Sequence, residues 1–131
     1  METSGWVEWP DYRIDVHRIR NRVRVSVGDR LLADSTSALL VAEQNHGIVL
    51  YLPRADVRSE DLVTADDTSR CPFKGQASYW RLADATEPVA WEYREPYPEV
   101  EILRDHLGFF QDRAAVEIGE AHPAVSGFQA H

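Results

Sequence analysis

The sequence predicts a single, mainly β domain of sandwich or barrel type with one or two short helices. Short apolar runs recur along the chain, and turn-forming residues separate them at short intervals, as is typical of such folds. The 131 residues have the length of one domain, and a hydrophobic content of 44% is enough for an ordinary core. We expect an irregular lead-in over residues 1–22, a β-rich domain over residues 23–118 and a tail over residues 119–131.

The first half of the chain predicts two hairpins. Valines alternate with polar residues over 23–27, the two-residue period of a strand with one solvated face. Gly28 then begins a tight turn that leads to a return strand over 31–33. The apolar runs 38–42 and 48–52, which a polar turn separates, form the second hairpin, and we expect both of its strands to be largely buried.

The second half of the chain alternates between polar segments and short strands. Residues 54–63 predict one short helical turn, and residues 64–70 predict a polar loop. Apolar residues three and four positions apart favour a short helix over residues 99–107, directly after Pro98. Strands are predicted over residues 77–82, 89–93, 109–110 and 115–118.

Composition excludes several classes of function. A net charge of −8 opposes binding to nucleic acid, whose phosphates require a basic surface. The single cysteine, Cys71, excludes an internal disulfide and a zinc site made of paired cysteines. The five histidines lack metal-ligand spacing, and glycine-rich nucleotide motifs are missing. We therefore expect no metal and no cofactor. The sequence has no run of about 18 apolar residues, so we also expect no membrane contact, in a cytoplasmic protein that could form a homodimer.

The stretch over residues 71–80 is the least ordinary part of the sequence. It places Cys71, Lys74, Tyr79 and Trp80 between a polar loop and a strand. Lys74 could lower the pKa of the thiol and make it a nucleophile, or its own amine could act as a general base or capture a carbonyl group. The alternative is a small buried cysteine beside a solvated surface lysine.

Aromatic residues recur on the next predicted strand. Trp91 and Tyr93 share one face of it, and Tyr79 or Trp80 from the neighbouring strand could complete a slot for a flat or cyclic ligand. Glu99 and Lys74 would then serve as polar anchors at the rim of the slot. The alternative is that these rings are simply core.

Three charged residues later in the chain are further candidates. Glu99, paired with Glu95 or with Asp112, could provide acid and base groups, although a chain with 22 acidic residues has many such pairs on solvated faces. Arg113, close to aromatic residues, is suited to bidentate binding of a carboxylate or phosphate. The alternative for Asp112 and Arg113 is a turn with a local ion pair.

The order of these segments, from about Val23 to Ile118, resembles the sequence pattern of the domain of unknown function 427 family. The block Cys-Pro-Phe-Lys-Gly at residues 71–75 is the most specific part of the resemblance. The family is sometimes labelled nucleotidyltransferase-like, a label that no phosphate or metal motif in this sequence supports. The matching segments are residues 33–35, 38–40, 51–57, 71–80, 90–93, 96–99 and 109–113.

The resemblance implies a β-tent or sandwich-like arrangement of two antiparallel sheets. That architecture is similar to those of the methionine-R-sulfoxide reductases and of the drug-binding domain of cereblon. Typical β-tent domains bind zinc through two pairs of cysteines, which this chain lacks. A cereblon-like aromatic cage would be formed here by Trp80, Trp91 and Tyr93, an expectation that is based on fold likeness alone.

These observations favour a small-metabolite-binding protein with an aromatic-lined pocket, which could also act as a cofactor-free enzyme. Any reaction would be an isomerisation, elimination or cyclisation. The alternative is a non-catalytic interaction or accessory domain whose aromatics are core. The expected catalytic residues are Cys71, Lys74, Glu99 and Asp112, and the expected ligand-binding residues are Tyr79, Trp80, Trp91, Tyr93 and Arg113.

Overall fold

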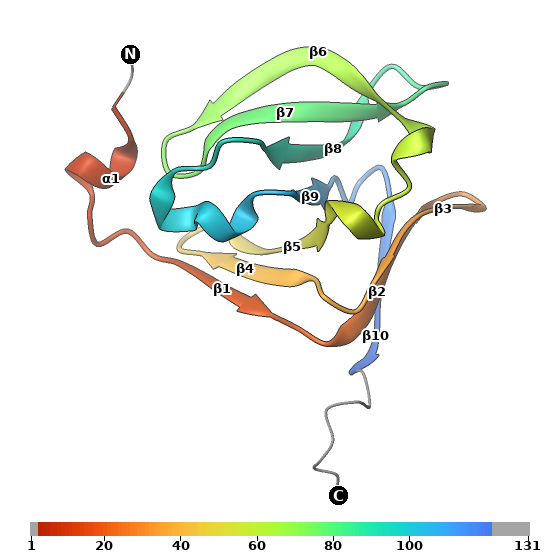
Figure 1. Cartoon of the computed structure of the whole chain (residues 1–131), viewed down its shortest axis with the longest axis horizontal. Coiled ribbons are helices and arrows are strands. Elements are labelled where there is room, and N and C mark those ends of the chain that lie inside the picture. The colour runs from red at the N-terminus through yellow and green to blue at the C-terminus, as the bar shows by residue number, and fades with distance from the viewer. Residues whose placement is uncertain (1–2, 122–131) are drawn as a thin grey trace, which may run out of the picture.

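Two antiparallel sheets make up the protein, as the computed structural model of residues 3–121 shows (Figure 1). The larger sheet has the strand order β1 (Ile14–Arg18), β4 (Leu39–Glu43), β5 (Gly47–Pro53), β9 (His106–Phe109), β8 (Pro88–Tyr93), β7 (Gly75–Leu82) and β6 (Leu62–Cys71). The smaller sheet has the order β10 (Ala115–Ala121), β2 (Asn21–Val27) and β3 (Arg30–Ser35). The predicted mainly β fold with two antiparallel sheets is confirmed.

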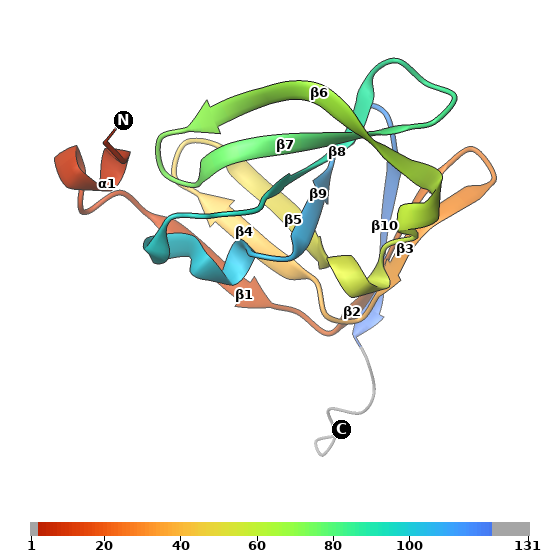
Figure 2. The same cartoon turned by 45° about the horizontal axis from the view of Figure 1, so that its top comes forward.

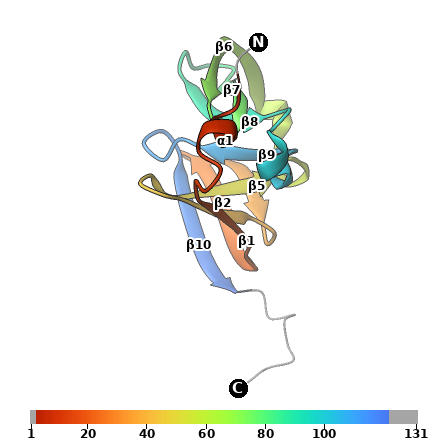
Figure 3. The same ribbon diagram turned by 90° about the vertical axis from the view of Figure 1, so that its left-hand side faces the viewer.

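The helical segments of the described range are short. They are α1 (Gly5–Glu8) and three 3-10 segments, η1 (Arg54–Asp56), η2 (Ser59–Asp61) and η3 (Pro98–Leu103). Figure 2 shows α1 and the segment that follows β8 at one end of the larger sheet, with the smaller sheet at the other end. Seen from the first end, α1 lies in front (Figure 3). No helix in the described part of the chain is long and apolar enough to cross a membrane.

Both predicted hairpins are confirmed. Strands β2 and β3 pair around Gly28, whose φ of 59° is the left-handed conformation that the turn requires. Strands β4 and β5 pair in the same way, and Asn45 adopts a φ of 65° in their turn. The two aromatic strands, β7 and β8, also form as predicted and pair with each other.

Two polar segments were wrongly predicted to lack strands. The lead-in over residues 1–22 contains β1, which pairs with β4 at one edge of the larger sheet. The loop predicted over residues 64–70 belongs to β6, which is polar because it is the opposite, largely exposed edge strand. Edge strands tolerate polar side chains on both faces, so their hydrophobic signal is weak.

The helix predicted over residues 99–107 was also wrong. Segment η3 ends at Leu103, and Asp105 takes a φ of 63°, which turns the chain into β9. Leu107 therefore packs as a strand residue in the core rather than on a helix. The tail begins later than predicted, because β10 continues to Ala121, and residues 122–131 lie outside the described residues.

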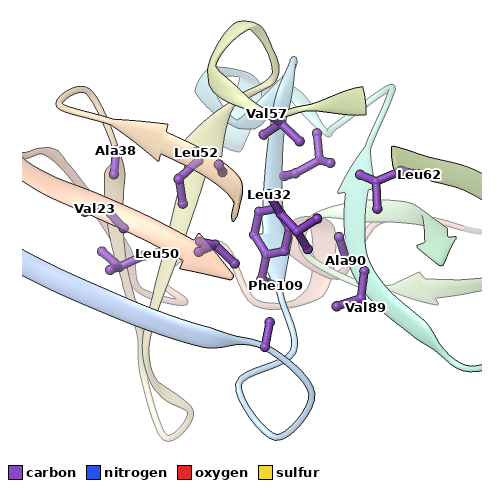
Figure 4. Packing of buried hydrophobic residues seen from close by; sticks show 14 of the residues in the cluster. Val23, Leu32, Ala38, Leu50, Leu52, Val57, Leu62, Val89, Ala90 and Phe109 are labelled. Carbon is purple, nitrogen blue, oxygen red and sulfur yellow. The ribbon is translucent and has the colours of Figure 1, made fainter. Parts of the chain in front are cut away.

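The main hydrophobic core lies between the two sheets, where Val23 and Leu32 from the smaller sheet meet Leu50, Ala90 and Phe109 from the larger one (Figure 4). A second cluster, which we call the outer cluster, lies on the opposite face of the larger sheet. Segment η3 covers part of it. Its buried members are Leu39, Val41, Tyr51, Ala77, Tyr93, Val100 and Leu103.

Candidate functional site

One row of paired residues crosses the outer face of the larger sheet. Tyr79 pairs with Trp91, Trp91 pairs with Gly108, and Gly108 pairs with Tyr51. Directly paired residues on neighbouring strands point to the same side of a sheet, so the three aromatic side chains share this face. Because position 108 has no side chain, the indole of Trp91 lies over the backbone of β9.

These rings line a cleft of about 200 Å³, which we call the aromatic cleft. The ring centroid of Phe110 lies 4.8 Å from that of Trp91 and 6.1 Å from that of the nearly parallel Tyr79. Drug-sized ligands need pockets of roughly 300 Å³ or more, so this cleft suits a molecule with one ring. Its lining residues are Val49, Tyr51, Lys74, Tyr79, Trp91, Tyr93 and Phe110.

Lys74 is the only cationic residue of this lining and the only lysine in the sequence. It is 7% exposed, its Nζ donates a hydrogen bond to Glu43 Oε1, and Nζ lies 3.9 Å from Sγ of Cys71. Tyr12 donates its hydroxyl to Oε2 of Glu43 at 2.5 Å. A buried ammonium group needs a paired charge, which Glu43 supplies. An amine, a carboxylate and a phenol are thus linked by hydrogen bonds beside the cleft.

The pKa values of Glu43 and Tyr12 reflect this arrangement. Burial acts to raise the pKa of Glu43, but the hydrogen bonds from Lys74 and Tyr12 outweigh it and hold the pKa below its usual range. Glu43 is therefore ionised at neutral pH. Burial, together with the hydrogen bond to Glu43, raises the pKa of Tyr12, which remains a donor.

The N-terminal segment holds the turn that carries Cys71 and Lys74. Phe73, at the centre of that turn, stacks on Tyr12 with ring centroids 3.7 Å apart. Trp6 meets the Phe73 ring edge-on at 5.2 Å and donates its indole N–H to the Phe73 carbonyl oxygen at 2.7 Å. Residues before β1 are therefore part of the support of the site.

The two buried tyrosines of the cleft keep their protons. Burial raises the pKa values of Tyr51 and Tyr93 well above their usual range. The hydroxyl oxygen of Tyr51 accepts a hydrogen bond from Nε1 of Trp91 at 3.2 Å, which fixes the indole in its place. The cleft walls are therefore mainly aromatic, and Lys74 provides a charged group among the lining residues.

Trp80 lies away from the aromatic cleft, on the opposite face of the larger sheet. Successive residues of a strand alternate between faces, so Tyr79, and not Trp80, joins Trp91 and Tyr93. Nε1 of Trp80 donates at 2.6 Å to Glu92, a carboxylate that is 1% exposed. Arg54 also donates to that carboxylate.

Three other predicted site residues do not line the cleft. Glu99 is exposed on η3 and Asp112 is exposed after β9. The guanidinium group of Arg113 lies over the ring of Phe110 at 4.8 Å, but it pairs with Glu87 at 2.9 Å and donates to a backbone carbonyl. The structure brings together Cys71, Lys74, Tyr79, Trp91 and Tyr93 from the predicted set.

Sequence reasoning missed Glu43, Tyr12, Tyr51 and Phe110. A signal for Tyr51 was present, because it is the one aromatic residue in an aliphatic strand and shares its face with Val49. Glu43 and Tyr12 gave no local signal, since each acts through a contact with a residue distant in sequence.

Among residues 3–121, no three histidine, cysteine, aspartate or glutamate side chains are grouped so that they could hold a metal ion.

Comparison with known proteins agrees with the resemblance. No curated protein matches the chain. The family model described as "Domain of unknown function (DUF427)" matches residues 15–120, most of the sequence, and the chain therefore belongs to the DUF427 family.

Proposed function

We propose that this protein binds a small molecule with a single ring in the aromatic cleft, with Lys74 as the polar anchor. The proposal is based on one observation: Tyr79, Trp91 and Phe110 lie together in a cleft that Lys74 also lines. Aromatic walls with a few placed polar groups are typical of small-molecule sites. The ligand therefore presents a carbonyl or other acceptor group toward Lys74.

The same site has groups for acid and base chemistry. Lys74 and Glu43 share a hydrogen bond, and Tyr12 donates to the same carboxylate. These groups can move a proton to or from a ligand without a cofactor. An isomerisation, elimination or cyclisation of the bound molecule fits such groups, and Cys71 stands beside the amine as a further candidate nucleophile.

The competing proposal is an interaction or accessory domain whose aromatics serve only the core. Tyr51 and Tyr93 favour it, because they are 2% and 8% exposed and belong to the outer cluster. Tyr79, Trp91 and Phe110 favour the ligand site, because they remain half-buried at the cleft. The two proposals differ in whether these three rings contact a ligand.

Thermal unfolding with benzamide, a single ring that bears a carbonyl acceptor, tests the proposal. We expect benzamide to raise the unfolding midpoint of the wild type, because a ligand that binds only the folded state stabilises it. Trp91→Ala should abolish this shift and Lys74→Ala should reduce it. Asp29→Asn, an exposed change in the β2–β3 turn of the smaller sheet, should leave it intact. Equal shifts in all four proteins, or none in the wild type across a library of single-ring metabolites, would contradict the proposal.

A further inference from the structure

The amine of Lys74 combines three properties that suit covalent capture of a carbonyl group. Lys74 lines the aromatic cleft, the residue is almost completely buried, and its Nζ shares a hydrogen bond with a carboxylate. Imine formation requires an amine, a group that accepts and returns protons, and a site that limits access of water. The exposed arginines cannot take this role, because a guanidinium group keeps its proton and is a poor nucleophile.

We propose that Lys74 forms a reversible imine with an aldehyde carried on a single aromatic ring and held in the aromatic cleft. This inference rests on the proposed function, since the aromatic walls must first bind the ring. Trp91, Tyr79 and Phe110 contact the ring, and the aldehyde carbon faces Nζ of Lys74. Ring binding against these aromatic walls raises the effective concentration of the aldehyde at the amine.

The step balances with groups of this chain alone. Lys74 gives one proton to Glu43, and the freed electron pair of Nζ attacks the carbonyl carbon. A carbon–nitrogen bond forms, and a second proton moves from nitrogen to oxygen to give the carbinolamine. Glu43 returns its proton to that hydroxyl group, which leaves as water, and one proton remains on the imine nitrogen.

The charge balance of the site favours this product. The protonated imine carries the same single positive charge as the ammonium group it replaces, so Glu43 keeps an ion-pair partner. A reaction that removed the charge would leave a half-buried carboxylate without its cationic partner, which is costly. Tyr12 continues to donate to the other carboxylate oxygen and holds Glu43 in position.

The sequence makes the experiment unusually direct, because Lys74 is the only lysine. The full-length protein is incubated with benzaldehyde and sodium cyanoborohydride, which reduces an imine to a stable benzyl amine. Intact-mass measurement counts the benzyl groups, and peptide mapping separates Lys74 from the N-terminal α-amine. We expect Lys74 to be labelled at least tenfold faster than the α-amine, and we expect benzyl alcohol, which lacks the carbonyl, to slow the labelling as a competitor.

Three variants give the controls. Lys74→Arg keeps the positive charge and should retain only the labelling of the α-amine. Arg30→Lys adds an exposed lysine near Asp84 to the same molecule, and we expect this internal reference to react at least tenfold more slowly than Lys74. Glu43→Gln should slow labelling of Lys74 while thermal unfolding still shows a folded protein.

The outcomes separate this inference from the proposed function. If benzyl alcohol and benzamide stabilise the protein but Lys74 reacts no faster than the added lysine, the imine is refuted and ring binding stands. If none of the single-ring probes stabilises the wild type and Lys74 is not labelled preferentially, both proposals fail. Fast labelling that benzyl alcohol does not slow would also overturn the inference, because the aldehyde would then react without occupying the cleft.

Discussion

The indole of Trp91 occupies the space that a side chain at Gly108 would need. A Cβ at position 108 would lie 2.6 Å from Cζ2 and 2.8 Å from Cε2 of Trp91, closer than van der Waals contact allows. The neighbouring Tyr51 accepts a hydrogen bond from the same indole, so the ring has a fixed place above β9. The floor of the aromatic cleft therefore depends on one glycine.

Gly108→Ala should displace Trp91 and weaken ligand binding. The new methyl group forces the indole away from β9 or strains the strand, and overpacking of this kind typically costs about 1–3 kcal/mol. We expect a lower unfolding midpoint and at least a tenfold weaker affinity for benzamide, measured by calorimetric titration. Gly119→Ala is the matched control, because the nearest atom to its Cβ is at 3.5 Å. Unchanged affinity in Gly108→Ala would contradict the assigned cleft floor.

Trp80→Phe should destabilise the protein without affecting the cleft. The change removes a hydrogen-bond donor from Glu92, a carboxylate that is 1% exposed. The loss of one hydrogen bond to a buried charge costs about 1–3 kcal/mol of unfolding free energy. Urea unfolding should show this loss, while the affinity for benzamide stays within twofold of wild type. Trp91→Phe should instead cause a large loss of affinity for benzamide. A loss of affinity for benzamide in Trp80→Phe would contradict this prediction and would indicate that Trp80 belongs to the ligand site.

Local sequence patterns predicted the parts of the fold that depend on local chemistry. The turn at Gly28 and the alternation of valines before it were sufficient for the first hairpin. The segment after Pro98 was wrongly predicted as one helix, because Val100, Leu103 and Leu107 have helical spacing. Val100 and Leu103 belong to the 3-10 segment η3, and Leu107 belongs to strand β9. The left-handed conformation of Asp105, which turns the chain into β9 after the helical segment has ended, leaves no strong signal in sequence.

The candidate site was predictable to the extent that strand alternation decides it. Trp91 and Tyr93 were correctly placed on one face, but the choice between Tyr79 and Trp80 depended on the register of β7 with β8, which the sequence left open. The partner of Lys74 was not predictable, because Glu43 reaches it from a strand in the first half of the chain. Pairing of this kind is a property of the tertiary structure.

Acidification should destabilise the protein through His106. Burial, with the nearby Arg18 charge, lowers the pKa of this imidazole below its usual 6.5, despite the hydrogen bond to the Arg104 carbonyl and the Asp105 charge. The folded state therefore binds a proton less readily than the unfolded chain. This contribution to stability is complete above pH 6.5 and is lost as the pH falls through the folded-state pKa.

Urea unfolding between pH 7.5 and pH 5 measures this contribution. In the window below pH 6.5, His106 makes the free energy of unfolding fall by at most about 1.4 kcal/mol per pH unit. His106→Gln should remove that part of the slope, whereas His17→Gln, at an exposed position, should not. An identical slope in wild type and His106→Gln would show that other groups carry the pH dependence.

Tyr12→Phe tests whether the N-terminal segment supports the chemistry of the site. The phenylalanine keeps the stack on Phe73 but removes the hydroxyl that donates to Glu43, a loss of about 1–2 kcal/mol for a partly exposed bond to a charged group. Glu43 has a depressed folded-state pKa, so its contribution is complete above its usual value of 4.5 and is lost as the pH falls toward the folded-state pKa. Tyr12→Phe should bring the folded-state pKa of Glu43 closer to its unfolded-state value, so the protein should lose less stability on acidification.

A double-mutant cycle separates the hydrogen bond from general destabilisation. Glu43→Gln alone leaves the buried Lys74 without a charged partner, and it also removes the carboxylate to which Tyr12 donates. The effects of Tyr12→Phe and Glu43→Gln on the free energy of unfolding should therefore be less than additive, because Glu43→Gln removes the negative charge that strengthens the bond and Tyr12→Phe removes the bond itself. Strict additivity would mean that Tyr12 acts only through its ring. The expected coupling would instead make residues before β1 part of the machinery that keeps Glu43 ionised beside Lys74.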